Sequence, residues 1–190
     1  MFGLKVIPLH NNQSKLLKKA LQQDRDAQQK LYELYASKML SVCRQYVDDI
    51  HHAEDVMITG FTKVFNNLHA FRGEGSFEGW IRRIMIREAI TFLRSQKKMI
   101  IYTDEVFESE NSNLPYQDHL EVNDIQQLID ELPEGYRMVF LMYAVEGYKH
   151  QEIAEALQIT ESTSKSQLFK ARKLLQQKLQ QLNKRDHGTS

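Results

Sequence analysis

Basic side chains gather on one stretch near the C-terminus of the 190-residue chain. No acidic residue lies between Glu161 and Asp186, whereas the stretch carries Lys165, Lys170, Arg172, Lys173, Lys178, Lys184 and Arg185. A basic stripe of this kind on a helix attracts phosphate groups. A solvated helix face has the same composition, so the charge alone leaves both interpretations open.

A second group of residues combines aromatic rings with arginines. It comprises Phe71, Phe77 and Trp80 together with Arg72, Arg82, Arg83, Arg87 and Arg94. Arg87 follows Arg83 by four residues and Arg94 follows Arg87 by seven. On a helix, this spacing places the three arginines on one face. Aromatic rings can stack on single-stranded bases, and arginines can follow a phosphate backbone. Core packing is the alternative role for Phe77 and Trp80, and we favour it for Trp80.

Sequence motifs of catalytic chemistry are absent. The chain has no P-loop, no HExxH and no GxSxG. The adjacent His51 and His52 would point about 100° apart on a helix and could not share a metal ion. Cys43 is the single cysteine, which excludes a disulfide framework and a cysteine-based zinc site and fits a reducing compartment. We therefore expect no catalytic residue, no metal and no cofactor.

The composition is that of a folded, soluble chain. Hydrophobic residues make up 42 %, which is enough to form a core. The formal net charge is zero, but residues 1–95 carry +4, residues 96–124 carry −5 and residues 125–190 carry +1. No segment approaches the roughly 20 apolar residues of a membrane span, and we expect no signal peptide, because the first ten residues have no apolar stretch long enough for one. We expect a cytoplasmic protein without membrane insertion.

Apolar residues recur at helical spacing in the first half of the chain. They form three stripes: Leu31, Tyr35, Met39, Val42 and Tyr46; Ala53, Met57, Gly60, Val64 and Leu68; and Ile81, Ile84, Ala89 and Phe92. Asp24, Asp49 and Ser76 are candidate N-caps for the helices that carry these stripes. This pattern therefore predicts a helical bundle over residues 14–96.

A second helical unit follows an acidic segment that has no sustained period. Its inward positions are predicted to be Ile125, Leu128, Ile129, Leu132, Met138, Leu141, Met142, Val145, Ile153, Ala154, Leu157, Leu168, Ala171, Leu175, Leu179 and Leu182. A short helix, a turn at residues 158–160 and a long basic helix indicate a helix-turn-helix. The sequence thus predicts an all-α fold with two small helical domains, residues 1–96 and 122–190, joined by an acidic linker at 97–121.

The C-terminal motif, LPEGYRMVFLMYAVEGYKHQEIAEALQITESTSKSQLFKARKLL at residues 132–175, resembles region 4 of bacterial sigma factors, especially the extracytoplasmic-function (ECF) group of the sigma-70 family. In that family, the helix beginning near Glu161 enters the major groove of the minus-thirty-five promoter element. The resemblance assigns to this DNA Lys149, His150, Ser162, Thr163, Lys165, Ser166, Lys170, Arg172 and Lys173, and Phe169 shares their helix face. Residues near the helix N-terminus reach bases, and the later cations meet phosphates.

Residues 54–94 resemble regions 2.2 to 2.4 of the same family, so that the whole likeness covers roughly residues 20–96 and 122–182. The resemblance implies docking on a coiled coil of the largest polymerase subunit through Asp55, Val56, Ile58, Thr59 and Lys63. It also implies capture of a flipped minus-ten base by the loop from Phe71 to Ser76 and the helix after it. The residues implied there are Phe71, Arg72, Ser76, Phe77, Trp80, Arg83, Arg87 and Arg94.

Several positions depart from the family pattern. Ile58 and Thr59 replace a polar Gln-Glu pair, Ser164 replaces a frequent Val, and Gln158 stands where Gly is common in the turn. Lys149 replaces a capping Ser or Thr, and a missing N-cap typically costs about 1 kcal/mol.

The resemblance implies a sigma factor that binds core RNA polymerase, directs it to promoter DNA and helps to open that DNA. It also implies an anti-sigma protein as a partner. The departure at Ile58 and Thr59 motivates an alternative, a helix-turn-helix DNA-binding regulator that no longer binds polymerase. A third hypothesis is a protein-interaction module whose basic faces are only solvated, and an enzyme is the most remote.

Overall fold

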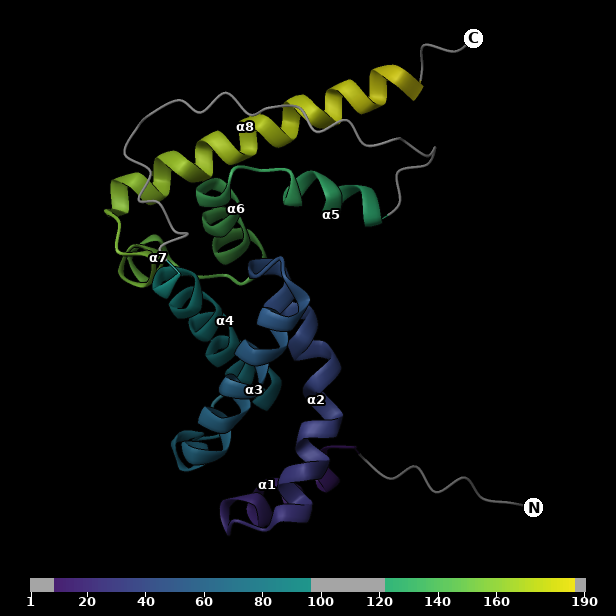
Figure 1. The fold of residues 1–190 in the computed structure, drawn as a ribbon, viewed down its shortest axis with the longest axis vertical. Coiled ribbons are helices and arrows are strands. Elements are labelled where there is room, and N and C mark those ends of the chain that lie inside the picture. The colour runs from purple at the N-terminus through teal and green to yellow at the C-terminus, as the bar shows by residue number, and fades with distance from the viewer. Residues whose placement is uncertain (1–8, 97–121, 187–190) are drawn as a thin grey trace, which may run out of the picture. The chain divides into compact units, whose positions relative to one another are not determined.

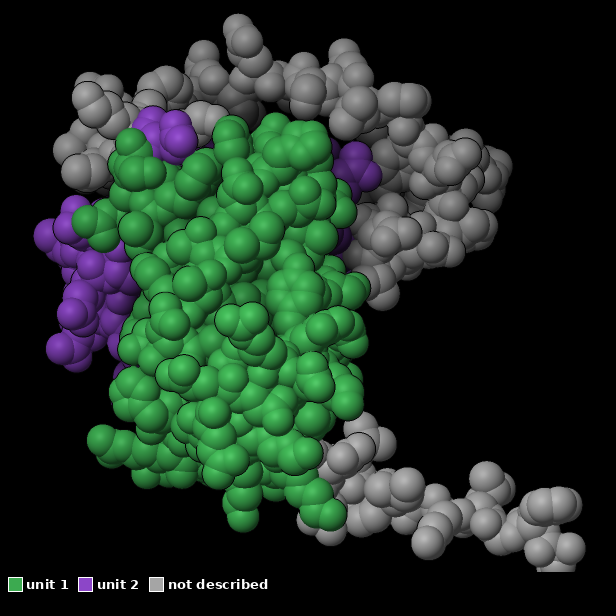
Figure 2. Space-filling model, turned by 60° about the horizontal axis from the view of Figure 1, so that its bottom comes forward, with its two compact units in different colours: residues 1–95 green, residues 96–190 purple. Residues whose placement is uncertain are grey.

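A computed structural model describes residues 9–96 and 122–186, and within these ranges every regular element is a helix (Figure 1). The chain divides into two compact units, residues 1–95 and 96–190 (Figure 2), which we describe separately. The predicted all-α fold is confirmed. The linker predicted at 97–121 lies outside the described residues.

The first unit is a bundle of helices α2, α3 and α4, which pack against one another in every pairing. Its elements are α1 (Leu9–Leu21), α2 (Arg25–Tyr46), α3 (Ile50–Asn66), the 3₁₀ turn η1 (Leu68–Ala70) and α4 (Phe77–Ser95). Helix α1 packs on α2 and also contacts η1. The short turn and the loop after it therefore connect α3 to α4 beside α1.

The three predicted N-caps of this unit are confirmed. The Asp24 carboxylate accepts a hydrogen bond from the amide of Ala27 at 2.9 Å, and Asp49 accepts one from the amide of His52 at 3.0 Å. Ser76 Oγ accepts a hydrogen bond from the amide of Gly79 at 3.0 Å. Each cap satisfies an amide in the first turn that has no partner within the helix.

The core confirms two of the predicted stripes and corrects the third. All members of the stripes on α2 and α3, together with Leu68, are buried. On α4, Ile81 and Ala89 are buried, but Ile84 and Phe92 are only half-buried. The core positions there are instead Met85, Ile86, Ile90 and Leu93. The run Ile-Met-Ile at 84–86 is apolar all round, so its spacing did not decide which residue faces inward.

The second unit is built around the long helix α8. Its elements are α5 (Val122–Asp130), α6 (Glu134–Phe140), the π-helical turn η2 (Leu141–Val145), α7 (His150–Leu157) and α8 (Glu161–Asp186). Helices α6 and α7 both pack on α8, and α5 contacts it as well. The turn η2 continues α6 without a break and widens the helix, because the amide of Glu146 bonds the carbonyl of Leu141 five residues earlier at 3.0 Å.

Most predicted core positions of this unit are buried. They are Leu128, Ile129, Leu132, Met138, Leu141, Met142, Ile153, Leu157, Leu168 and Ala171. Ala154, Leu175 and Leu179 are half-buried, and the side chain of Leu182 lies outside the described residues. The predictions for Ile125 and Val145 were wrong, because they are 54 % and 48 % exposed. Val145 ends the π-helical turn, whose angular step per residue is smaller than that of an α-helix.

Candidate nucleic-acid interface

Three aromatic rings cluster at the start of α4. The Phe77 ring centroid lies 5.2 Å from that of Phe71 and 5.8 Å from that of Trp80, and the Phe71 and Trp80 centroids are 5.6 Å apart. Phe77 is only 3 % exposed, so it offers no free ring face to a base. We therefore withdraw Phe77 from direct contact and assign it the support of Phe71 and Trp80. Trp80 is half-buried and not part of the core, so the core role that we favoured for it is corrected, and Phe71 is half-buried as well.

The loop between Phe71 and Phe77 has a conformation that depends on glycine. Gly73 and Gly75 have φ angles of 78° and 104°, which residues other than glycine rarely adopt. Arg72 and Ser76 in the same loop are exposed. Because Ser76 Oγ already caps α4, its hydroxyl is engaged in the free protein. The glycines thus define the path of the loop, and Ser76 anchors its end.

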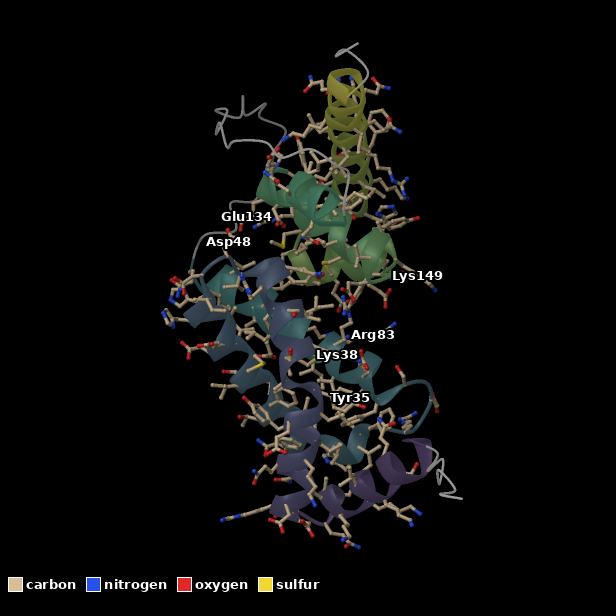
Figure 3. The ribbon with its side chains drawn as sticks, turned by 90° about the vertical axis from the view of Figure 1, so that its right-hand side faces the viewer. Tyr35, Lys38, Asp48, Arg83, Glu134 and Lys149 are labelled. Atoms are coloured by element: carbon tan, nitrogen blue, oxygen red, sulfur yellow. The ribbon has the colours of Figure 1, made fainter. Side chains whose placement is uncertain are left out.

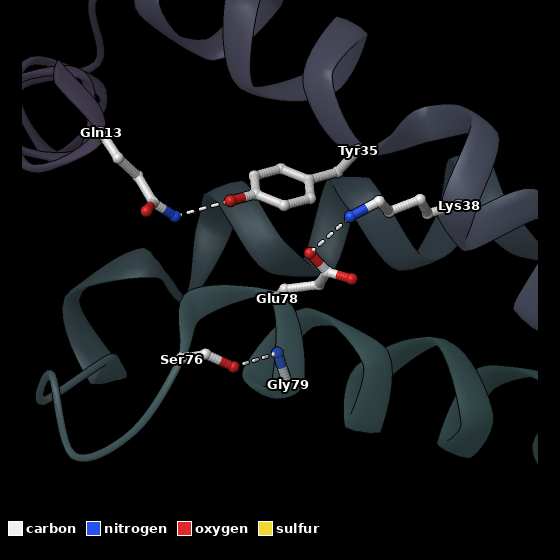
Figure 4. A network of polar contacts seen from close by, with 6 residues as sticks. All are labelled: Gln13, Tyr35, Lys38, Ser76, Glu78 and Gly79. Atoms are coloured by element: carbon white, nitrogen blue, oxygen red, sulfur yellow. Dashed lines mark hydrogen bonds and ion pairs between the residues drawn. The ribbon is translucent and has the colours of Figure 1, made fainter. Parts of the chain in front are cut away.

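Polar contacts from α1 and α2 converge on the same region (Figure 4). Gln13 Nε2 donates to the hydroxyl oxygen of Tyr35 at 2.6 Å, and Lys38 Nζ lies 2.9 Å from Glu78 Oε2. Burial, and next the charge of Glu78, raise the pKa of the Tyr35 hydroxyl, which stays neutral. The Tyr35 ring also meets the Phe77 ring edge-on at 5.7 Å. Helices α1 and α2 therefore both brace the aromatic cluster.

Arginines line the outer face of α4, as the sequence spacing predicts. Arg83, which Figure 3 labels, is exposed, and so are Arg87 and Arg94. The acidic residue within this run, Glu88, is engaged by Lys63 of α3 at 2.7 Å, and its side chain is only 12 % exposed. Since Lys63 offsets the charge of Glu88, the outer face of α4 remains basic.

The outer surface of α3 carries four of the five residues predicted to contact polymerase. Asp55, Ile58, Thr59 and Lys63 are exposed, and the Ile58 side chain shows 54 % of its surface. Val56 is 4 % exposed and packs in the core. We therefore withdraw Val56 from the contact surface and assign it the support of α3 from within. Contact with another protein would remove the exposed Ile58 side chain from water.

The predicted helix-turn-helix is formed by α7 and α8. Gln158 in its turn has φ 57° and ψ 41°, the left-handed conformation that glycine adopts most readily. Thr160 Oγ1 caps α8 by accepting a hydrogen bond from the amide of Thr163 at 3.0 Å. At the start of α7, the amide of Lys149 donates to Glu152 Oε2 at 2.8 Å, so Glu152 supplies one half of a capping box.

The outer face of α8 carries the predicted minus-thirty-five residues. Ser162, Lys165, Arg172 and Lys173 are exposed, whereas Thr163, Ser166 and Lys170 are half-buried. Phe169 on this face is 70 % exposed. At the start of α7, the Lys149 side chain extends outward (Figure 3), and His150 is half-buried. Ser162 and Thr163 thus come first along the helix and Lys170, Arg172 and Lys173 come later, the order that suits base contacts first and phosphate contacts afterwards.

A buried polar contact that the sequence analysis missed joins α7 to α8. Ser164 is 0 % exposed, and its Oγ lies 2.9 Å from His150 Nδ1. The His150 ring stacks on Tyr143 of η2 with centroids 4.6 Å apart, and Arg172 Cζ lies 5.6 Å from the Tyr143 centroid. Ser164 lies four residues before the core residue Leu168, and this spacing was the signal that could have placed it inward.

No group of three or more metal-ligating side chains is placed to hold an ion in the part of the chain that the structure describes. None of the helices in this part is long and apolar enough to cross a membrane.

Comparisons with known families match both units. Residues 31–99 match the model of Sigma-70 region 2, and residues 123–175 match the model of Sigma-70, region 4. The two matches occur in the predicted order and together cover more than half of the chain. The chain belongs to the sigma-70 family. The predicted resemblance to the ECF group is confirmed as well, and helix α1 precedes the region 2 match.

Individual sigma factors are similar along most of the chain. The RNA polymerase sigma factor SigV of Bacillus subtilis is 31 % identical over 130 residues, which cover 68 % of this chain and 77 % of SigV. The ECF RNA polymerase sigma factor SigW of the same organism is 27 % identical over 181 residues, covering 88 % and 97 % of the two chains. The sigma factor RpoE of Bartonella quintana, solved in complex with the anti-sigma factor NepR, shares the fold with a TM-score of 0.50 at 19 % identity. That match covers 80 % of this chain and 96 % of the solved one.

Proposed function

We propose that this protein is an ECF sigma factor that binds core RNA polymerase, directs it to promoters and helps to open promoter DNA. One observation carries the proposal: region 2 and region 4 matches follow each other in a single chain, each on its own compact unit. An isolated helix-turn-helix would be far less specific, because many regulators contain one.

The polymerase contact is assigned to the exposed surface of α3. Asp55, Ile58, Thr59 and Lys63 lie outward there, within the region 2 match. The exposed Ile58 takes the place of a polar residue, so we propose that this contact is more apolar here than in the family pattern. Burial of an apolar side chain at an interface contributes roughly 1.5–3 kcal/mol when it is complete.

The minus-ten contact is assigned to the aromatic cluster and the arginine face of α4. Phe71 and Trp80 are half-buried rings that can accept a base displaced from the duplex, and Phe77 holds both in place. Arg72, Arg83, Arg87 and Arg94 are exposed and can follow the phosphates of the separated strand. Stacking on an aromatic ring contributes roughly 1–3 kcal/mol per base, which favours the open form.

The minus-thirty-five contact is assigned to the outer face of α8 and the start of α7. Ser162, Thr163, Lys165 and Ser166 occupy the first two turns of α8, where a recognition helix meets bases. Lys170, Arg172, Lys173, Lys149 and His150 then contact phosphates. In this proposal residues 1–96 serve polymerase and the minus-ten element, residues 97–121 link the domains, and residues 122–190 serve the minus-thirty-five element.

Further parts of the proposal rest on the family. Sigma-70 proteins are generally non-enzymatic initiation factors, and we propose that this chain likewise catalyses no reaction and needs no cofactor. We place its action in the cytoplasm, where transcription occurs. We also propose control by an anti-sigma protein, as in the solved complex of the Bartonella quintana sigma factor.

The proposal is tested by co-elution of the purified protein with cognate core RNA polymerase on a sizing column. We expect stoichiometric co-elution, reduced by Ile58→Asp on α3. Leu21→Asp is the matched control, since Leu21 is a similarly exposed apolar residue at the end of α1. If the folded wild-type protein elutes apart from active core, the polymerase assignment is wrong and the regulator or the protein-interaction hypothesis replaces it.

A further inference from the structure

The π-helical turn η2 presents a tyrosine to both helices of the helix-turn-helix. The amide of Glu146 bonds the carbonyl of Leu141, and the amide of Tyr148 bonds that of Met142 at 2.9 Å. The half-buried Tyr143 lies in this widened turn. Its ring contacts His150 of α7 and Arg172 of α8, so one side chain bridges three elements. Widened turns of this kind often occur at functional sites.

The contacts of Tyr143 have two different geometries. The His150 ring stacks on it at 4.6 Å with an interplanar angle of 25°. The guanidinium carbon of Arg172 lies 5.6 Å from its ring centroid, within the range of a cation–π interaction. His150 has a second partner in Ser164, whose Oγ lies 2.9 Å from His150 Nδ1. Ser164 is fully buried, so its hydroxyl cannot contact DNA directly.

We propose that Tyr143 and Ser164 are positioning residues for DNA binding: Tyr143 orients Arg172, and Ser164 orients His150, toward the phosphate backbone. This inference rests on the proposed function, which assigns Arg172 and His150 to phosphates. An exposed arginine loses much rotamer freedom when it binds a phosphate. A side chain already held over an aromatic ring loses less, because part of that ordering is present in the free protein.

The arrangement also explains why a serine is useful at a buried position where the family often has valine. A Ser hydroxyl can donate to His150 Nδ1 or accept from it, so the contact forms with either tautomer of the ring. Valine would fill the space but would leave His150 without this partner. The buried hydroxyl thus maintains the orientation of a ring at the start of α7.

A double-mutant cycle on full-length protein tests the role of Tyr143. The probe is a short fluorescent duplex of mixed sequence at low salt, since phosphate contacts are independent of sequence. We expect Arg172→Ala to weaken binding and to lower the salt slope by about one. Tyr143→Leu should weaken binding roughly twofold to fivefold, whereas Tyr143→Phe keeps the ring and should bind like wild type. In the Arg172→Ala background, Tyr143→Leu should weaken binding clearly less than in the wild type, since only its stacking on His150 is then lost.

The outcomes separate this inference from the proposed function. If Arg172→Ala weakens binding but Tyr143→Leu weakens it equally in both backgrounds, Tyr143 only supports the fold and its positioning role is overturned. If Arg172→Ala changes neither affinity nor salt slope, the phosphate assignment of Arg172 in the proposed function is itself overturned. The same cycle with Ser164→Ala and His150→Ala tests the second pair: additive losses would overturn the role of Ser164.

Discussion

Lys165 Nζ lies 2.7 Å from Oε1 of Glu161, one helical turn earlier on α8. The pairing lowers the pKa of Glu161, first through its hydrogen bond with Lys165, so Glu161 is ionised at neutral pH. The cation that we assign to promoter DNA therefore has an intramolecular partner in the free protein. DNA must compete with this partner, and the carboxylate also repels phosphates near the start of the recognition helix.

Glu161→Gln should strengthen duplex binding, because it removes that negative charge and releases Lys165. We expect a gain of roughly twofold to tenfold at low salt, which shrinks as salt rises. Fluorescence anisotropy with the minus-thirty-five duplex measures it. Glu155→Gln on α7 removes the same charge from another exposed position of the unit and is the matched control. Equal gains from both variants would show a general charge effect and would reject the specific competition.

Phe71→Ala should impair promoter opening more than initial promoter binding. The variant removes a half-buried ring from the cluster with Phe77 and Trp80, and a lost base stack costs roughly 1–3 kcal/mol. Permanganate footprinting of unpaired thymines measures opening, and filter binding measures total complex. Phe65→Ala, at another half-buried ring, is the control. Normal opening by the folded Phe71→Ala variant would remove this ring from the minus-ten site.

Gly60→Ala should destabilise the first unit although alanine is the better helix former. A Cβ atom at Gly60 would come within 3.0 Å of Met85 side-chain atoms, and Met85 is itself fully buried. Overpacking typically costs 1–3 kcal/mol, against a helix gain of about 1 kcal/mol, so we expect a net loss of about 1 kcal/mol. Urea unfolding of the variant measures it.

Gly79→Ala is the matched helical control for that experiment. Its Cβ would meet only the capping hydroxyl of Ser76, at 3.0 Å, and no core side chain, and the helix gain of about 1 kcal/mol from alanine offsets a weakened cap of similar size. We expect little change in stability from Gly79→Ala. A Gly60→Ala variant as stable as the wild type would mean that Met85 can shift without cost.

Cys43 should make the folded protein less stable at high pH. Burial raises the pKa of the Cys43 thiol from 9.0 to about 12, so above pH 9 the unfolded chain loses a proton that the folded chain keeps. The unfolded state then gains stability, and this thiol lowers the unfolding free energy by up to about 1.4 kcal/mol per pH unit. The difference in urea unfolding between wild type and Cys43→Ala, followed from pH 8 to 10.5, isolates this effect. A difference that is constant with pH would contradict the account.

The sequence predicted the helices and their caps because these depend on local signals. Asp24, Asp49 and Ser76 each precede an apolar period and each cap the helix that follows. The predicted register of α4 was partly wrong because Ile84, Met85 and Ile86 are all apolar, and packing against α2 and α3 selects the inward face.

Contacts between residues that are far apart in the sequence could not be predicted from such local signals. Lys63 and Glu88 are 25 residues apart, and nothing local pairs them. The π-helical turn at Leu141–Val145 likewise has no simple sequence signature, so the outward position of Val145 and the bridging position of Tyr143 were missed. The outward positions of Ser162, Lys165 and Lys173 on α8 were predictable because Leu168 and Ala171 turn inward on the same helix and are buried.

The most direct test of the central claim is transcription in vitro by cognate core RNA polymerase on genomic DNA fragments, with and without this protein. We predict start sites that depend on the protein and that share two upstream sequence elements, near minus ten and minus thirty-five. Transcription from these start sites should be reduced by Phe71→Ala and by Arg172→Ala. If the core initiates normally with another sigma factor but gives no start site that depends on this protein, the assignment as a sigma factor is contradicted.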